Sequence, residues 1–164
     1  MQRVLFVCLG NICRSPTAEA AFGALLAARG LADGFHVDSA GTSDNHLGEA
    51  AHPSTRAEAS RRGVAITHRA RQVTHADFAR FDRIVAMDRQ NHRDLVRLAR
   101  TDAERAKVSL FRGYEPGADH DDVPDPWYTG EFARVYDICA RAAEGLLAAI
   151  EAERIERDDA LSPR

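Results

Sequence analysis

Cys8 and Arg14 are the residues of this sequence whose types and spacing point most directly to chemistry. They lie in a short segment that joins a β-prone run to the expected start of a helix, Cys8-Leu9-Gly10-Asn11-Ile12-Cys13-Arg14-Ser15. Backbone N–H groups of such a segment can converge on one anion, and the helix N-terminus adds a positive dipole. Gly10 and Asn11 tolerate the left-handed backbone that the curl requires. The segment therefore predicts an anion cradle of phosphate size.

The arginine of this cradle offers a planar fork of donors that can hold two phosphate oxygens at once. Its charge and the helix terminus also favour the thiolate of a neighbouring cysteine, which is the nucleophilic form. A cysteine that ends a strand is often a small buried apolar residue, but Arg14, the curl and the helix start favour catalysis. We expect Cys8 to be ionised at neutral pH and to attack phosphorus in line.

The cradle must be positioned by a sheet. Four β-prone runs are expected as strands, over residues 4–8, 35–39, 83–87 and 107–111. Helices are expected from Ser15 to Gly30 with Pro16 in the first helical position, over 54–62 and 89–100, and along an apolar stripe from Phe132 to Ile150. This alternation predicts a parallel α/β sheet, which binds ligands outside the carboxyl ends of its strands. The loop after Cys8 lies at such an end.

The composition indicates a protein of one domain and argues against several kinds of partner and location. A chain of 164 residues, 45% of them apolar, fits one domain with one core. A net charge of -3 without a basic stripe argues against a nucleic-acid partner. There is no apolar run or leader that predicts membrane insertion or secretion. Three cysteines, Cys8, Cys13 and Cys139, form no even set, which indicates a reducing compartment. We expect a cytoplasmic protein.

Neither a metal nor a cofactor is expected. The acidic residues Asp119, Asp121 and Asp122 lie in an irregular segment over 112–128, but their spacing does not follow a calcium-binding loop. Zinc at Cys8 and Cys13 would be opposed by the neighbouring arginine.

The run from Val7 to Pro16 resembles the signature of the low-molecular-weight protein tyrosine phosphatases. Three further segments resemble that family in the same order, Asp38-Ser39-Ala40-Gly41, Met87-Asp88 and Asp125-Pro126-Trp127-Tyr128. The resemblance implies a three-layer α/β fold in which a four-stranded parallel sheet has helices on both faces. It implies one phosphatase domain over residues 1–157, followed by a polar tail over 158–164. Beyond Ile155 we expect the chain to be frayed.

The resemblance also implies a function, the hydrolysis of phosphotyrosine in proteins through a cysteinyl-phosphate intermediate. Cys8 is then the nucleophile, Arg14 binds phosphate and Asp125 is the general acid for a phenolate that leaves poorly by itself. The partner is a phosphotyrosine-containing protein, and the enzyme itself is a monomer or associates weakly.

Further site residues follow from the same resemblance. The phosphate-binding loop comprises Leu9, Gly10, Asn11, Ile12, Cys13 and Ser15, and Ser39 and His68 brace it together with Asn11. For Ser15 two roles stay open, a hydrogen bond to the Cys8 sulfur and the cap of the helix. Relatives specialised for phosphoarginine carry threonine in place of Ile12.

Three residues are expected on the rim of a slot deep enough to select phosphotyrosine over the shorter phosphoserine, Asn45, Trp127 and Tyr128. Trp127 replaces a commoner tyrosine. Asn45 stands where many relatives have an aromatic residue, so we expect a clamp on one side only.

Cys13 has two interpretations. It packs in the core, or it forms a reversible disulfide with Cys8 on oxidation, as the resemblance implies and as we favour. Cys139 lies on the apolar stripe of the last helix and is expected to be structural.

The sequence argues against two rival functions. An arsenate reductase of the same fold needs two further cysteines, and residues 87–110 contain none. A binding module without catalysis would be expected to lose the nucleophile, the arginine or the acid, and the sequence has Cys8, Arg14 and Asp125.

Overall fold

The computed structural model describes residues 1–118 and 121–162, so Asp119 of the acidic segment and the last two residues of the predicted tail lie outside the described residues. Four strands form one sheet in the order β2-β1-β3-β4. They are β1 (Gln2–Cys8), β2 (Phe35–Gly41), β3 (Arg83–Ala86) and β4 (Val108–Leu110). Each neighbouring pair is parallel, so the predicted four-stranded parallel sheet is confirmed.

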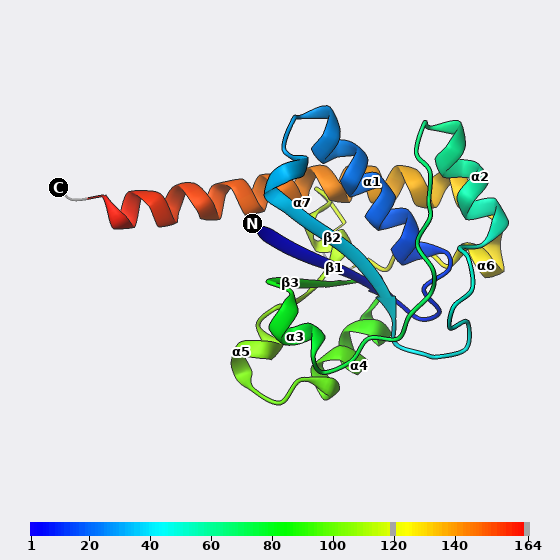
Figure 1. The fold of residues 1–164 in the computed structure, drawn as a ribbon, viewed down its shortest axis with the longest axis horizontal. Helices are drawn as coiled ribbons and strands as arrows, with labels where there is room; N and C mark the ends of the chain where they lie inside the picture. Colours follow the sequence, from blue (N-terminus) through cyan, green and yellow to red (C-terminus); the bar gives the residue numbers. More distant parts are fainter. Residues whose placement is uncertain (119–120, 163–164) are drawn as a thin grey trace.

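Helices cover both faces of this sheet, as Figure 1 shows. One face carries α1 (Arg14–Ala28), α2 (Pro53–Arg61), α6 (Pro126–Thr129) and α7 (Phe132–Leu161). The other carries α3 (Asp77–Arg80), α4 (Arg89–Leu98) and α5 (Asp102–Arg105). Two short 3-10 turns complete the described elements, η1 (Ala32–Gly34) and η2 (Phe111–Tyr114). The three-layer α/β architecture is that expected from the sequence.

The central strand β1 explains why its apolar run is continuous. Val4 and Phe6 face the core formed with α1 and α7, where the Phe6 and Phe22 rings meet edge to face at 5.7 Å. Leu5 and Val7 face the second core, beneath α4. A strand that is buried on both faces has no polar side. This packing fixes the strand whose last residue is Cys8.

The start of α1 differs from the prediction. The helix begins at Arg14 with Cys13 as its N-cap residue, so Ser15 lies inside the first turn and its predicted capping role is wrong. Pro16 is the third helical residue rather than the first, which is tolerated because first-turn N–H groups need no partner within the helix. The hydroxyl of Thr17 donates to the Cys13 carbonyl oxygen at 2.7 Å. The Ser15 side chain is thereby free for another role.

The end of α7 also differs. The helix continues to Leu161, although frayed chain is expected from the sequence beyond Ile155, and its last turns project from the body of the protein (Figure 1). Residues 151–162 are all exposed, so packing does not hold them. Seven of these twelve residues are alanine, glutamate or arginine, which are strong helix formers. None of the helices described is long and apolar enough to cross a bilayer.

Candidate active site

The loop after β1 curls as predicted, but its two special residues act differently. Asn11 has a φ of 57° and is left-handed. Gly10 is not, and its need for glycine is one of space, because a Cβ there would lie 2.9 Å from Cδ2 of His46. Gly41, which pairs with Cys8 at the end of β2, likewise leaves room for the loop, since its Cβ would lie 2.7 Å from the Leu9 carbonyl oxygen.

The sulfur of Cys8 is held by donors. Ser15 Oγ lies 3.0 Å from Sγ, and the backbone N–H of Asn11 donates to Sγ at 3.3 Å. Ser15 is fully buried, and its oxygen already accepts from Nδ2 of Asn11 at 2.8 Å. The hydroxyl of Ser15 has two acceptors within reach, the sulfur at 3.0 Å and the Ala40 carbonyl oxygen at 3.4 Å, and the sulfur is the nearer. The contacts of Ser15 and Asn11 both place hydrogen-bond donors at the sulfur.

Arg14 is buried at the start of α1, and its guanidinium is aligned by two elements. Nη1 donates to Oδ2 of Asp88 at 2.7 Å and to the carbonyl oxygen of Val123 at 3.2 Å. Burial alone would lower the pKa of Arg14, but the negative charge of Cys8 and the hydrogen bond to Asp88 raise it above its ordinary value. The cradle thus contains a permanent positive charge in a fixed orientation.

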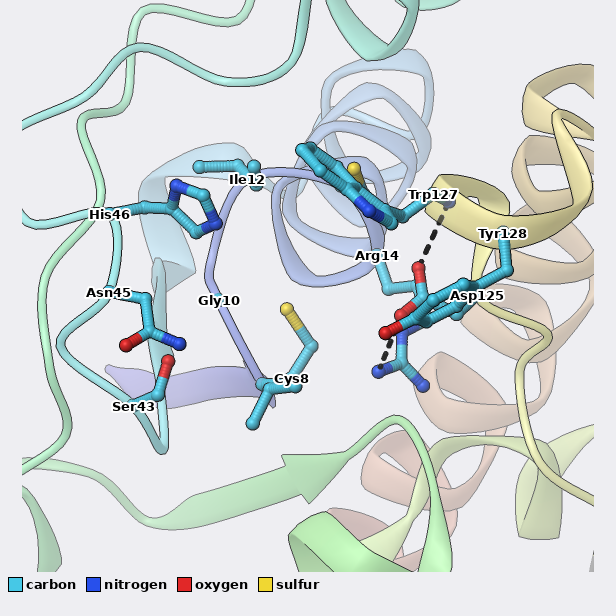
Figure 2. Close-up of a pocket in the computed structure, with 12 residues that line it drawn as sticks. Cys8, Gly10, Ile12, Arg14, Ser43, Asn45, His46, Asp125, Trp127 and Tyr128 are labelled. Carbon is cyan, nitrogen blue, oxygen red and sulfur yellow. Dashed lines mark hydrogen bonds and ion pairs between the residues drawn. The ribbon is translucent and has the colours of Figure 1, made fainter.

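Asp125 lies on the far side of the same cavity. Its Oδ2 is 3.6 Å from Nη2 of Arg14, and its Oδ1 accepts the backbone N–H of Trp127 at 3.1 Å as the cap of α6. Figure 2 shows Cys8, Arg14 and Asp125 around one opening. The cap holds one carboxylate oxygen and leaves the other toward the cavity.

The cavity has a volume of about 210 Å³. Besides these three residues it is lined by predicted members of the loop and rim, namely Leu9, Gly10, Ile12, Cys13, Asn45, Trp127 and Tyr128, and by Ser43 and His46. Cys8 is 3% exposed, whereas Trp127 is 55% exposed. The thiol thus lies deep and the aromatic residues lie at the mouth (Figure 2).

Comparison with known proteins identifies the family. The model of the low molecular weight phosphotyrosine protein phosphatases matches residues 3–156. The chain belongs to this family. A low molecular weight protein-tyrosine-phosphatase of Streptomyces coelicolor is 46% identical over 159 residues, covering 94% of this chain and 96% of the relative. The human low molecular weight phosphotyrosine protein phosphatase is 41% identical, covering 88% and 92%.

Solved structures agree with the fold of this family. The crystal structure of YfkJ from Bacillus subtilis is 42% identical and superposes with a TM-score of 0.88, covering 93% of this chain and 96% of that one. A protein tyrosine phosphatase from Entamoeba histolytica, with Hepes in its active site, has the same TM-score at 35% identity. These coverages show that most of the chain has the fold of these structures.

The predicted phosphate-binding loop is braced by the side chain of Asn11. Its Nδ2 donates to Ser15 and to Ser39, at 2.8 and 3.0 Å. Its Oδ1 lies 2.8 Å from Nε2 of His68 and accepts the backbone N–H of Arg71 at 3.0 Å. Asn11 thus uses every hydrogen-bonding position of its amide. Ser39 and His68 both occupy the supporting positions predicted for them.

A layer of charges lies behind this brace. Nδ1 of His68 is 3.3 Å from Asp38, and Arg71 bridges Asp38 and the buried Asp77 at 3.0 and 3.1 Å. Burial opposes ionisation of Asp38, but hydrogen bonds from His68 and Ser39 and the charge of Arg71 lower its pKa. Ligand atoms of Glu19, Asp38 and His68 lie within 4.8 Å of one another, but the guanidinium of Arg71 on Asp38 opposes a cation there, so we place no metal.

Asn11→Ala is expected to lower kcat by about 10², because a small displacement of catalytic groups has an effect of that order. The alanine adds strain at the positive φ, so Asn11→Gly is the matched variant that removes the side chain alone. Steady-state kinetics and thermal melting of both variants check this. Full activity in Asn11→Gly would contradict a positioning role for the amide.

Three residues of the site were given no role from the sequence, Asp88, Arg71 and His46, although Asp88 belongs to the segment Met87-Asp88 that resembles the family. Asp88 directly follows the predicted third strand, and its place at a carboxyl end was a usable signal. His46 lies on a loop without periodicity, and no pattern marks it. Its ring centroid is 5.9 Å from that of Trp127 (Figure 2). The rim opposite Trp127 therefore carries the imidazole ring of His46, although Asn45 itself is not aromatic. Nδ1 of His46 is held by Glu49 at 2.6 Å.

Cys13 is reduced and nearly buried at the edge of the cavity. Burial raises the pKa of its thiol to about 12, against an opposing hydrogen bond with Thr55. The thiol is therefore protonated at neutral pH. Cys139 is fully buried in the core between α7 and the sheet, as expected for a structural cysteine.

Proposed function

We propose that the protein hydrolyses phosphotyrosine in proteins through a phosphate ester of the Cys8 thiol. The observation that carries this proposal is the convergence of a donor-stabilised sulfur, a buried guanidinium and a carboxyl group on one cavity. Each of the three corresponds to one requirement of the reaction: a nucleophile, a group that binds phosphate oxygens and an acid for the leaving group.

In the first step, the cradle N–H groups and Arg14 bind the phosphate dianion. Cys8 then attacks phosphorus, forming the S–P bond as the P–O bond to the tyrosine ring breaks. Asp125 donates its proton to the phenolate oxygen, so that neutral tyrosine leaves. Arg14 is suited to this step because Asp88 fixes the plane of its guanidinium before substrate arrives.

In the second step, water attacks the phosphorus of the thiophosphate. The carboxylate of Asp125 accepts a proton from the water, and the electrons of the S–P bond return to Cys8 as it leaves. Ser15, whose Oγ is 3.0 Å from the sulfur, stabilises the departing thiolate. Inorganic phosphate is released and the enzyme regains its starting state.

The shape of the cavity supports an aryl phosphate as substrate. Trp127, Tyr128 and His46 surround its mouth, while Cys8 lies at the bottom. The ring of a phosphotyrosine can reach from the mouth of the cavity to Cys8, with the faces of the ring against aromatic side chains. A phosphoserine is too short to bring phosphorus to Cys8 while its backbone stays outside.

Purified protein is therefore expected to hydrolyse p-nitrophenyl phosphate and phosphotyrosyl peptides in EDTA, and to be inhibited by vanadate. Matched phosphoseryl peptides should be poor substrates. Equal turnover of phosphoserine, or none of any phosphate ester, would overturn the proposal. Thioredoxin-coupled reduction of arsenate would favour the rival reductase. A cytoplasmic location and a monomeric or weakly associating state stay predictions.

Oxidation is expected to join Cys8 and Cys13. A sulfenic acid on Cys8 would condense with the adjacent thiol, releasing water and forming a disulfide. Because the pKa of Cys13 is about 12, this closure should accelerate as pH rises above neutrality. Mass spectrometry after peroxide treatment at several pH values measures the linked peptide. Recovery of Cys8 only as sulfinic or sulfonic acid would contradict this role of Cys13.

A further inference from the structure

We propose that a second subsite beside the catalytic cavity binds a basic side chain flanking the phosphotyrosine of the substrate. This inference rests on the proposed function, since it names the class of peptide that the same enzyme prefers. A second hollow of about 350 Å³ lies beside the catalytic cavity. The two hollows share four walls, Leu9, Arg14, Asp125 and Tyr128. A residue close to phosphotyrosine in the peptide can therefore reach the second hollow.

Negative charge dominates the lining of this hollow. The carboxylates of Asp88, Asp122 and Asp125 line it, against the one guanidinium of Arg14. When Arg14 binds the substrate phosphate, its charge is neutralised by that anion. Asp125 carries the proton of the general acid in that complex, so the carboxylates of Asp88 and Asp122 are the charges that favour a cation and oppose an acidic side chain.

Asn91 provides an independent indication of a ligand. It lines the hollow and is 1% exposed, yet its Oδ1 has no hydrogen-bond partner among the residues that the structure describes. Leaving a buried amide oxygen unpaired is unfavourable, and a donor on a ligand would remove that cost. Lysine and arginine are the side chains that combine several N–H donors with positive charge.

The positive end of α4 does not turn the hollow into an anion site. The N–H of Asn91 is bound by Asp88 at 2.7 Å, and the N–H of Arg89 by Asp122 at 3.0 Å. The side chain of Arg89, whose Nε is 3.9 Å from Asp122, is largely exposed and is not part of the lining. It lies at the surface, where solvent and salt screen its charge.

The remaining walls fit the stem of a long basic residue. Leu9 and Tyr128 are exposed, at 45% and 81%, and Pro124 lies beside them in the lining. The methylene groups of lysine or arginine can cover such apolar surface while the charged end reaches the carboxylates. Leu9 and Tyr128 thus border the phosphotyrosine on one side and the basic residue on the other.

Matched phosphotyrosyl peptides test the subsite. Each peptide has arginine, alanine or glutamate at one position, and the positions tested are the two residues before and the two residues after the phosphotyrosine. At one position, arginine is expected to raise kcat/KM about fivefold over alanine, as for a partly exposed ion pair, and glutamate to lower it. Asp122→Asn removes a charge of the hollow, and Gln90→Lys adds an opposing charge at another residue of its lining, so each should bring the arginine-to-alanine ratio near one. Asp121→Asn, on the same segment but outside the hollow, is the control that retains the ratio.

Equal kcat/KM for the three peptides at every position would overturn the subsite while leaving phosphotyrosine hydrolysis intact. A preference for arginine that survives both Asp122→Asn and Gln90→Lys would overturn it as well. Absence of turnover with every phosphotyrosyl substrate would instead overturn the proposed function, and the subsite with it.

Discussion

Cys8→Ser is expected to lower kcat on aryl phosphates by about 10³-fold or more, because a serine hydroxyl is not ionised near neutral pH. The change replaces one atom at a buried position, and serine fits the space of cysteine. The variant should therefore fold, bind phosphate analogues and fail in the chemical step. Steady-state kinetics, circular dichroism and vanadate titration measure these three properties.

The matched control is Cys139→Ala. Cys139 is buried in the α7 core, where burial raises the pKa of its thiol, and it does not line the catalytic cavity. Its loss should lower the melting temperature slightly and leave kcat nearly unchanged. Comparable losses of activity in the two variants would mean that the Cys8 effect is structural rather than chemical.

Asp125→Asn is expected to lower kcat by about 10²–10⁴ on phosphotyrosine, because the leaving phenolate then departs without a proton. The substitution is well matched, since asparagine can still cap α6 through the oxygen that accepts the Trp127 N–H. The loss should grow with the basicity of the leaving phenol. A series of substituted aryl phosphates measures this dependence.

Asp121→Asn is the control for this series, because Asp121 lies on the same acidic segment but does not line the cavity. It should behave like the unmodified protein with every leaving group. If Asp125→Asn lowered turnover equally for all phenols, Asp125 would not be the proton donor.

Local sequence predicted the cradle well. The residues from Cys8 to Ser15 are contiguous, so the chain itself brings them together, and the apolar run of β1 marks a strand covered on both faces. The same local reasoning erred over Ser15, because proline is tolerated throughout a first helical turn and does not define where the helix begins. It also erred at the end of α7, where helix propensity extends the element beyond its packed part.

Long-range contacts were harder to anticipate. The resemblance to the family supplied Asp125, and no spacing between it and Cys8 indicates that they share a cavity. Asp88 and Arg71 act through contacts with Arg14 and Asp38, and only the packed sheet brings these pairs together. Asn45 suggested an open rim, but the neighbouring His46 turns its ring toward Trp127. Such details depend on loop conformation, which hydrophobic patterning does not encode.

The central claim is that phosphate passes through a covalent bond to sulfur at Cys8. Rapid acid quench of the enzyme during turnover of a phosphotyrosyl peptide, followed by mass spectrometry of the digested protein, tests it directly. The expected result is a phosphate group on the peptide that contains Cys8, and no such group in Cys8→Ala. Phosphate on another residue, or undiminished turnover by Cys8→Ala, would contradict the account.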